Sequence, residues 1–249
     1  MRSKNMFSSS NPMFGEKIYQ DPTLVPSDII GSQMMTVQGA INKTLMLFGL
    51  LLATSLVGYM FPNPLFIWGG AIGGLIVVII SVFKKDKSPI LAPLYAALEG
   101  LFVGGISYMY ASMMNGIILQ AVTLTFALLF LMLFIYKTGI IKVTNKFRAG
   151  VVMATGAVLM VYVLSWILGM FGINIPFLHE GGIMGIGISL VIIGIACMNL
   201  LLDFDNFEKG EEHQMPKYME WFFAMGLIIT LVWLYLEILR LLSKFSSRN

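Results

Sequence analysis

The chain has 249 residues and a formal net charge of +3; 57% of the residues are hydrophobic and 12% are charged. Soluble domains carry about twice that charged fraction, and the apolar residues form blocks longer than a soluble core uses. The composition excludes a soluble enzyme, a disordered chain, a nucleic-acid-binding protein and, with one cysteine, a disulfide-stabilised secreted domain. We therefore expect an all-α integral membrane protein whose main partner is the lipid bilayer.

Residues 1–33 are expected to form a flexible cytoplasmic segment, because a serine-rich run at residues 8–12 and two further prolines interrupt any periodicity. No apolar core follows the basic start, so we do not interpret it as a signal peptide. Residues 34–43 are expected to lead into the first helix along the membrane interface.

A spanning helix needs roughly 20 mostly apolar residues, and seven such stretches follow one another within a membrane domain of residues 34–245. Turn signals such as Pro62-Asn63-Pro64, or clusters of charge, separate them. Residues 246–249 are left as a short tail. The predicted helices cover residues 44–60, 65–83, 90–111, 117–136, 149–171, 182–204 and 219–243.

Basic residues alternate between the loops. All but three of the sixteen lysines and arginines lie in the N-terminal segment or in the second, fourth and sixth loops, and the other loops have none. By the positive-inside rule, the N-terminus is cytoplasmic, and we expect a multi-pass protein of a bacterial inner membrane. Arg240, Lys244 and Arg248 at the C-terminus break the pattern. Either the last helix crosses despite the rule, which its length favours, or it is bent or re-entrant.

Glycines cluster in three of the predicted helices. Small residues spaced four apart let helix backbones approach closely in lipid, so we interpret the clusters as packing contacts rather than hinges. The clusters are Gly69, Gly70, Gly73 and Gly74 in the second helix, Gly100, Gly104 and Gly105 in the third, and Gly185, Gly187 and Gly194 in the sixth.

Ionisable residues at membrane depth cost a few kcal/mol each and are functional candidates for that reason. Glu99 lies deep in the third helix. It belongs either to an ion or proton pathway or to a structural site, as a neutral carboxyl bonded to a neighbouring helix. Glu237 lies towards the far end of the last helix, where its spacing to Arg240 favours a structural ion pair.

Acidic residues gather at the cytoplasmic end of the sixth helix. Asp203 and Asp205 end the apolar run, and Asp205 shares a helix face with Glu208. Carboxylates in this position titrate as a coupled group and can attract a hard cation such as calcium, although the spacing is not that of an EF-hand. Glu220 opens the last helix on the same side and is expected to meet Asp205.

Lys84 and Lys85 follow the second helix on this side of the membrane. They are either ordinary positive-inside anchors or a basic latch on the aspartates. Enzyme chemistry is not indicated: both histidines lie in predicted loops, no G-x-S-x-G or P-loop occurs, and no metal or cofactor motif is found. We expect no catalytic activity and no cofactor.

Several strings resemble the Bax inhibitor family, also called transmembrane Bax-inhibitor-motif proteins, in its bacterial branch with an extended N-terminus. They are Met-Thr-Val-Gln-Gly-Ala-Ile-Asn-Lys-Thr at residues 35–44, Leu-Asp-Phe-Asp-Asn-Phe-Glu at 202–208, Pro-Lys-Tyr-Met-Glu-Trp at 216–221 and Leu-Tyr-Leu-Glu-Ile-Leu-Arg at 234–240. The resemblance implies six helices around a central last helix. It also implies a pH-sensitive calcium leak or a role in ion homeostasis.

The resemblance further implies a sensor of two acids on the sixth and seventh helices with a basic latch from the second. Asp205 matches the first acid. Glu237 matches the second by its neighbouring letters, whereas Glu220 matches it better by its early position in the helix. Lys84 and Lys85 occupy the place of the latch.

Three functions follow as hypotheses. The first is a pH-modulated leak channel for a cation, with calcium preferred. The alternative is a non-conducting regulator that binds another membrane protein, such as a quality-control protease, through the N-terminal segment and the glycine-rich faces. The third is a proton-coupled transporter that uses Glu99.

Overall fold

The computed structural model describes residues 34–172 and 182–246. Within these ranges the regular structure is helical, apart from an isolated antiparallel bridge between Met34 and Pro216. In the part of the chain that the structure describes, seven helices are long and apolar enough to cross a membrane, which confirms the expected all-α membrane protein. The predicted flexible segment 1–33 and the loop that carries His179 and Glu180 lie outside the described residues.

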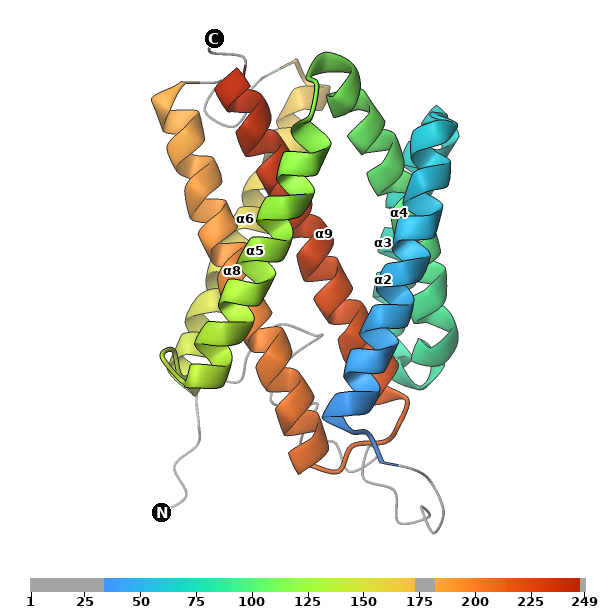
Figure 1. The fold of residues 1–249 in the computed structure, drawn as a ribbon, viewed down its shortest axis with the longest axis vertical. Coiled ribbons are helices and arrows are strands. Elements are labelled where there is room, and N and C mark those ends of the chain that lie inside the picture. The colour runs from blue at the N-terminus through green and yellow to red at the C-terminus, as the bar shows by residue number, and fades with distance from the viewer. Residues whose placement is uncertain (1–33, 173–181, 247–249) are drawn as a thin grey trace. The chain divides into compact units, whose positions relative to one another are not determined.

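The helices follow one another through short connections, and a 3-10 turn, η2 (Lys85–Lys87), joins two of them. Proline at the first position and the Asn63 side chain at the cap start the second helix. In chain order the helices are α2 (Val37–Met60), α3 (Pro64–Phe83), α4 (Ser88–Met113), α5 (Ile117–Thr138), α6 (Asn145–Met170), α8 (Ile183–Glu212) and α9 (Met219–Ser246) (Figure 1).

Two helices differ from their predicted ranges in a way that matters for function. The side chain of Thr36 accepts a hydrogen bond from the Gly39 amide, so α2 begins at Val37 rather than at residue 44. The second of these helices, α8, does not end at residue 204. It continues to Glu212, because no proline follows until Pro216. The acidic residues after residue 204 therefore lie on a helix rather than in a loop.

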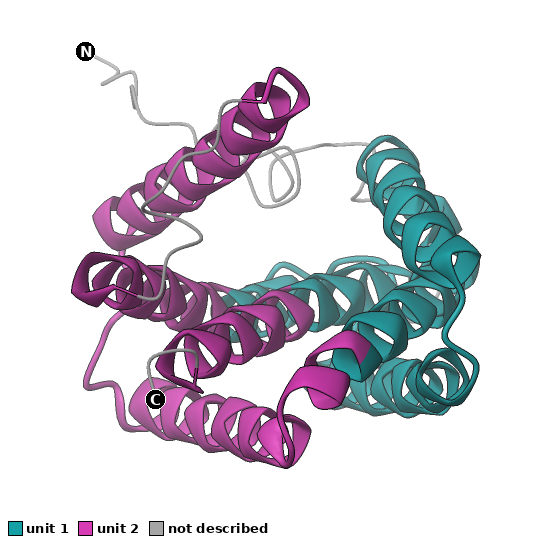
Figure 2. Cartoon of the chain, turned by 90° about the horizontal axis from the view of Figure 1, so that it is seen from above, with its two compact units in different colours: residues 1–108, 203–229 teal, residues 109–202, 230–249 magenta. Residues whose placement is uncertain are grey.

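The chain divides into two units, which Figure 2 colours separately. Among the described residues, unit 1 contains residues 34–108 and 203–229. Unit 2 contains residues 109–172, 182–202 and 230–246. Helices α2 and α3 belong to unit 1 and helices α5 and α6 to unit 2, whereas α4, α8 and α9 contribute residues to both.

Glycines bring the helices of unit 1 into backbone contact. A Cβ atom at Gly70 of α3 would lie 2.5 Å from the Leu98 carbonyl oxygen of α4, and one at Gly104 of α4 would overlap the Ser55 carbonyl of α2. The packing interpretation is therefore right for these positions. Gly69 in α3, like Gly187 and Gly194 in α8, has no atom within 4 Å of an added Cβ, so packing does not explain these three.

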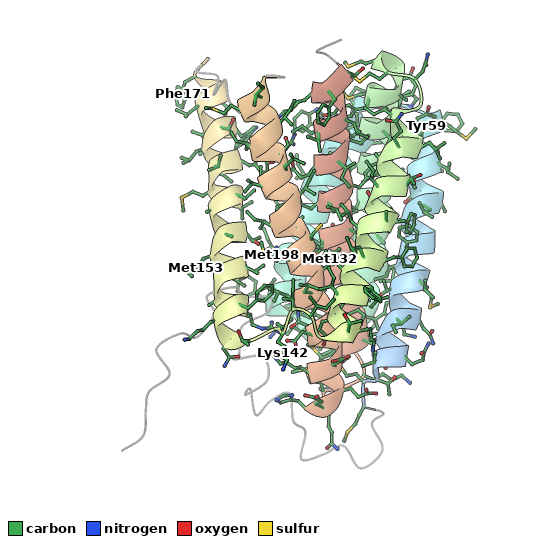
Figure 3. All side chains as sticks on the ribbon, turned by 60° about the vertical axis from the view of Figure 1, so that its left-hand side comes forward. Tyr59, Met132, Lys142, Met153, Phe171 and Met198 are labelled. Atoms are coloured by element: carbon green, nitrogen blue, oxygen red, sulfur yellow. The ribbon has the colours of Figure 1, made fainter. Side chains whose placement is uncertain are left out.

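Burial differs strongly among the spans. In the most apolar stretch of α9, 83% of residues are buried, as in a helix packed on most of its surface, whereas in α6 the share is 6%. Long side chains of α6 such as Met153, which is 69% exposed, lie on its outer side (Figure 3). Because lipid covers such a face as well as a protein core does, α6 needs specific contacts to stay docked. One is the 2.7 Å hydrogen bond from Asn199 of α8 to Thr155.

Candidate functional site

Glu99 lies near the middle of α4, a 26-residue helix with no other charged residue. It is half-buried and faces α3, where a Cβ atom at Gly74 would lie 2.8 Å from its Oε2. The ring of Tyr95, one turn earlier and 4% exposed, borders the same place. Across residues 34–172 and 182–246, the Glu99 carboxyl has neither a hydrogen bond nor an ion pair. Gly74, which has no side chain, leaves room for it.

An unpaired carboxylate in the middle of a span is costly, because neither water nor protein donors compensate its charge. Helix α3, against which Glu99 packs, carries no charged residue from Pro64 to Phe83. Such a carboxyl group is suited to holding a proton or receiving a cation in transit. The structural alternative required a hydrogen bond to a neighbouring helix, and none is present in the described chain.

The end of α8 presents the acidic residues expected from the sequence. Asp203 is 3% exposed, and Asp205 forms an ion pair with Lys209 at 2.8 Å, one turn further along the helix. Both side chains of this pair are partly accessible, so it is a solvated i,i+4 pair of modest energy. The sequence analysis had counted Lys209 among the basic residues of the sixth loop and had not paired it with Asp205.

Glu220, the second residue of α9, is 2% exposed. Its Oε1 accepts a hydrogen bond of 3.1 Å from the Thr36 amide and a longer one of 3.5 Å from the Thr36 hydroxyl. The donors are therefore neutral groups at the start of α2. A direct meeting of Glu220 with Asp205 stays a prediction.

Gly39 explains how the Glu220 carboxyl reaches α2. A Cβ atom at this position would overlap the carboxyl group, so a residue with a side chain cannot stand there without displacing it. The sequence carried part of this signal, because threonine is a favoured N-cap residue. The identity of the carboxylate depends on a contact between residues 184 positions apart.

The candidate latch residues lie at the end of α3. Lys84 is the C-cap of this helix and is exposed, and Lys85 starts η2 and is half-buried. Both positions suit interfacial anchors. Their pairing with the aspartates of α8 stays a prediction.

In unit 2, Glu237 of α9 is 1% exposed and is neutralised by its own helix. Arg240 Nη1 lies 2.9 Å from Oε1 and 3.1 Å from Oε2, which confirms the predicted i,i+3 pair. The hydroxyl of Tyr162 of α6 donates to the carboxylate and accepts from Arg240. The Trp233 indole donates at 3.3 Å. This arrangement is a structural one that ties α6 to α9, and sequence reasoning missed its tyrosine.

Lys244, near the end of α9, is 5% exposed and donates to the Gly185 carbonyl and the Ser189 hydroxyl of α8 at 3.0 and 2.9 Å. Two of the three C-terminal cations are therefore engaged in contacts within unit 2. The third, Arg248, lies outside the described residues.

Comparison with known proteins identifies the family of this chain. Searches of curated proteins and of solved structures found no match. A family model described as Bax inhibitor 1 like matches residues 3–247. The match covers nearly all of the chain, including every helix that carries the acidic residues discussed above, so this all-α membrane protein belongs to the Bax inhibitor 1 like family.

Proposed function

We propose that the protein is a pH-modulated leak pathway for cations, with calcium as its cargo, and that it has no catalytic activity. The observation that carries the proposal is Glu99, an ionisable group in the middle of a span with no hydrogen bond or ion pair in the described chain. Intramembrane carboxylates of this kind typically mark ion or proton pathways. The family membership supports the same direction without fixing the ion.

The contrast with Glu237 strengthens this assignment. Both carboxylates lie in apolar helices, but Glu237 has an arginine at 2.9 Å and further donors from tyrosine and tryptophan. A carboxylate that serves only the fold is expected to be compensated in this way. Glu99 lacks such compensation, and we therefore assign it to the pathway.

Asp203 and Asp205 supply carboxylate oxygens at the end of α8, and such oxygens are the ligands that calcium prefers. We propose that they attract the cation to unit 1 and that Glu99 receives it within the helices. Acidification converts carboxylates into neutral acids, which removes the attraction. The flux therefore varies with pH.

Calcium influx into liposomes that contain an entrapped calcium dye tests the proposal, with equal pH on both sides of the membrane. Wild-type protein is expected to exceed protein-free vesicles and to change between about pH 5 and 8. Glu99→Gln is expected to lose about tenfold in flux, equivalent to one interaction of about 1.4 kcal/mol. Glu212→Gln, at an exposed acid that ends α8, is the matched control. Absence of flux in wild type at every pH would overturn the proposal.

We further propose that the protein lies in a bacterial inner membrane with its N-terminus in the cytoplasm, as the basic loops indicate. Single cysteines in a Cys197→Ser background, probed with an impermeant maleimide on intact cells, test the orientation. Lys142→Cys, at an exposed loop position (Figure 3), is expected to react only after permeabilisation. Met113→Cys and Phe245→Cys, at positions 73% and 47% exposed, are expected to react in intact cells. The reverse pattern would refute the orientation.

A second candidate function is a non-conducting regulator that binds another membrane protein, and α6 is the observation that favours it. Its Gly150 and Gly156 have no atom within 4 Å of an added Cβ, so a helix from another protein has room to approach closely. A photo-crosslinking residue at Gly156 tests this in native membranes. Crosslinking to one defined membrane protein, together with absent flux, would favour the regulator over the leak.

A further inference from the structure

The residues that lead into α2 are fixed against the connection between α8 and α9, within unit 1. The Met35 amide donates to the Met215 carbonyl at 2.8 Å, and Met34 forms the isolated bridge with Pro216. Met35 is 1% exposed, and its sulfur lies 2.5 Å from where a Cβ atom at Gly210 would be. The absence of a side chain at Gly210 therefore creates the slot that holds Met35.

The start of α2 also meets two carboxylates from this segment. The first amides of a helix have no partners within it and carry the positive end of its dipole. The Thr36 amide donates to Glu220 at 3.1 Å, and the Val37 amide donates to Glu211 at 3.3 Å. A further capping hydrogen bond lies within the start of α2 itself, where the Gly39 amide donates to the Thr36 hydroxyl at 2.9 Å. Two acids far along the chain thus complete the cap of α2.

We propose that Glu220, assisted by Glu211, is a charge-dependent cap that fixes the start of α2 to the α8–α9 connection, and that acidification releases it. In the charged form, each carboxylate accepts a charge-assisted hydrogen bond and interacts favourably with the helix dipole. Protonation removes the charge, and with it most of both contributions. Glu220 is 2% exposed, so little water replaces them. This assignment does not depend on whether the protein conducts ions.

The elements that form this contact carry other charged groups. From α2, the Lys43 ammonium lies 4.9 Å from the ring centre of Trp221, the residue after Glu220. This places a cation beside the start of α9, over an aromatic ring. The same elements carry further titratable side chains, namely Asp203, Asp205, Glu208, Lys209, Glu212, His213, Lys217 and Tyr218.

Glu220 is the stronger of the two caps. It is buried and accepts two bonds, whereas Glu211 is exposed and accepts one at longer range. Solvent screens the exposed carboxylate and replaces its bond at little cost. The release is therefore expected to follow the charge of Glu220, with a smaller contribution from Glu211.

Hydrogen exchange of the full chain in detergent micelles tests the proposal, with rates at residues 34–42 corrected for the intrinsic effect of pH. Wild type is expected to lose about tenfold in protection on acidification, the size of one charge-assisted hydrogen bond. Glu220→Gln is expected to show the lower protection already at neutral pH and to lose most of its pH dependence. Glu211→Gln is expected to show a smaller loss, and Glu212→Gln no loss.

Exchange within α5, which belongs to unit 2, reports whether a variant has unfolded as a whole. A local release leaves this helix protected, whereas global unfolding exposes it. Equal protection of residues 34–42 in wild type and Glu220→Gln at all pH values would overturn the proposal. So would a wild-type protection that stays constant on acidification, a result that needs no variant. Calcium flux, measured separately, bears on the leak but not on this cap.

Discussion

Replacement of Gly39 by alanine is expected to destabilise the protein, although alanine is the better helix former. The new Cβ would occupy the place of the Glu220 carboxyl. Because the carboxyl ends a flexible side chain, it can swing away, but only by giving up its bonds from Thr36. Loss of a hydrogen bond to a charged group costs about 1.5–3 kcal/mol. The higher helix propensity of alanine offsets up to about 1 kcal/mol of this loss. The net loss is about 0.5–2 kcal/mol.

Thermal unfolding of the detergent-solubilised protein measures this loss. For a chain of this size, 1 kcal/mol corresponds to about 2–4 °C in Tm, so Gly39→Ala is expected to unfold roughly 1–8 °C below wild type. Gly49→Ala is the matched control on the same helix, because Gly49 is exposed with no atom within 4 Å of an added Cβ. It is expected to leave Tm unchanged or slightly raised.

A double-mutant cycle separates the proposed contact from general intolerance of Gly39 to substitution. In a Glu220→Ala background the carboxyl is absent. Gly39→Ala is therefore expected to cause no further loss of stability and to add the stabilisation that comes from the higher helix propensity of alanine. The coupling between the two positions is then about 1.5–3 kcal/mol. Additive losses, or a Gly39→Ala protein as stable as Gly49→Ala, would refute the reasoning.

Three further predictions concern the packing and the polar contacts of the helices. Glu237→Gln is expected to lower the free energy of unfolding by about 1–3 kcal/mol, measured by thermal unfolding. A larger loss is not expected, because the Arg240 side chain is 36% exposed and solvent screens its charge. Tyr162→Phe is expected to cost about 1 kcal/mol alone and clearly less in a Glu237→Gln background; full additivity would contradict a shared network. Gly104→Ala is expected to cost about 1–3 kcal/mol, because its Cβ meets backbone, whereas Gly69→Ala in open space is expected to be neutral; equal Tm values would contradict this.

The number of spans could be predicted because an apolar run of sufficient length is a local property of the sequence. The ends of the spans were less predictable. α2 begins earlier than expected because Thr36 caps it, a pattern that apolar counting ignores. α8 extends to Glu212 because acidic residues do not stop a helix. The helix ends only where the connection that contains Pro216 begins. Hydropathy thus locates the membrane segment of a helix but not its solvated extension.

The same division holds for the site. The Glu237–Arg240 pair was predictable because i,i+3 neighbours meet on any helix. The bonds from Thr36 to Glu220 and from Tyr162 to Glu237 join residues 184 and 75 positions apart, and no local pattern specifies them. Glycine offers a partial signal, since Gly39 stands where a carboxyl needs space. Which carboxyl group fills that space depends on the tertiary structure.

The C-terminal cations, which break the charge pattern of the loops, are compatible with a last helix that crosses the membrane fully. The 28 residues of α9 extend about 42 Å, more than the roughly 30 Å of a hydrocarbon core, so its end can reach the far interface. The positive-inside rule concerns basic residues of the loops, whereas Arg240 and Lys244 lie within α9. Arg240 is paired with Glu237, and Lys244 is 5% exposed and bonded to α8. They serve helix contacts, so the loops alone indicate the orientation.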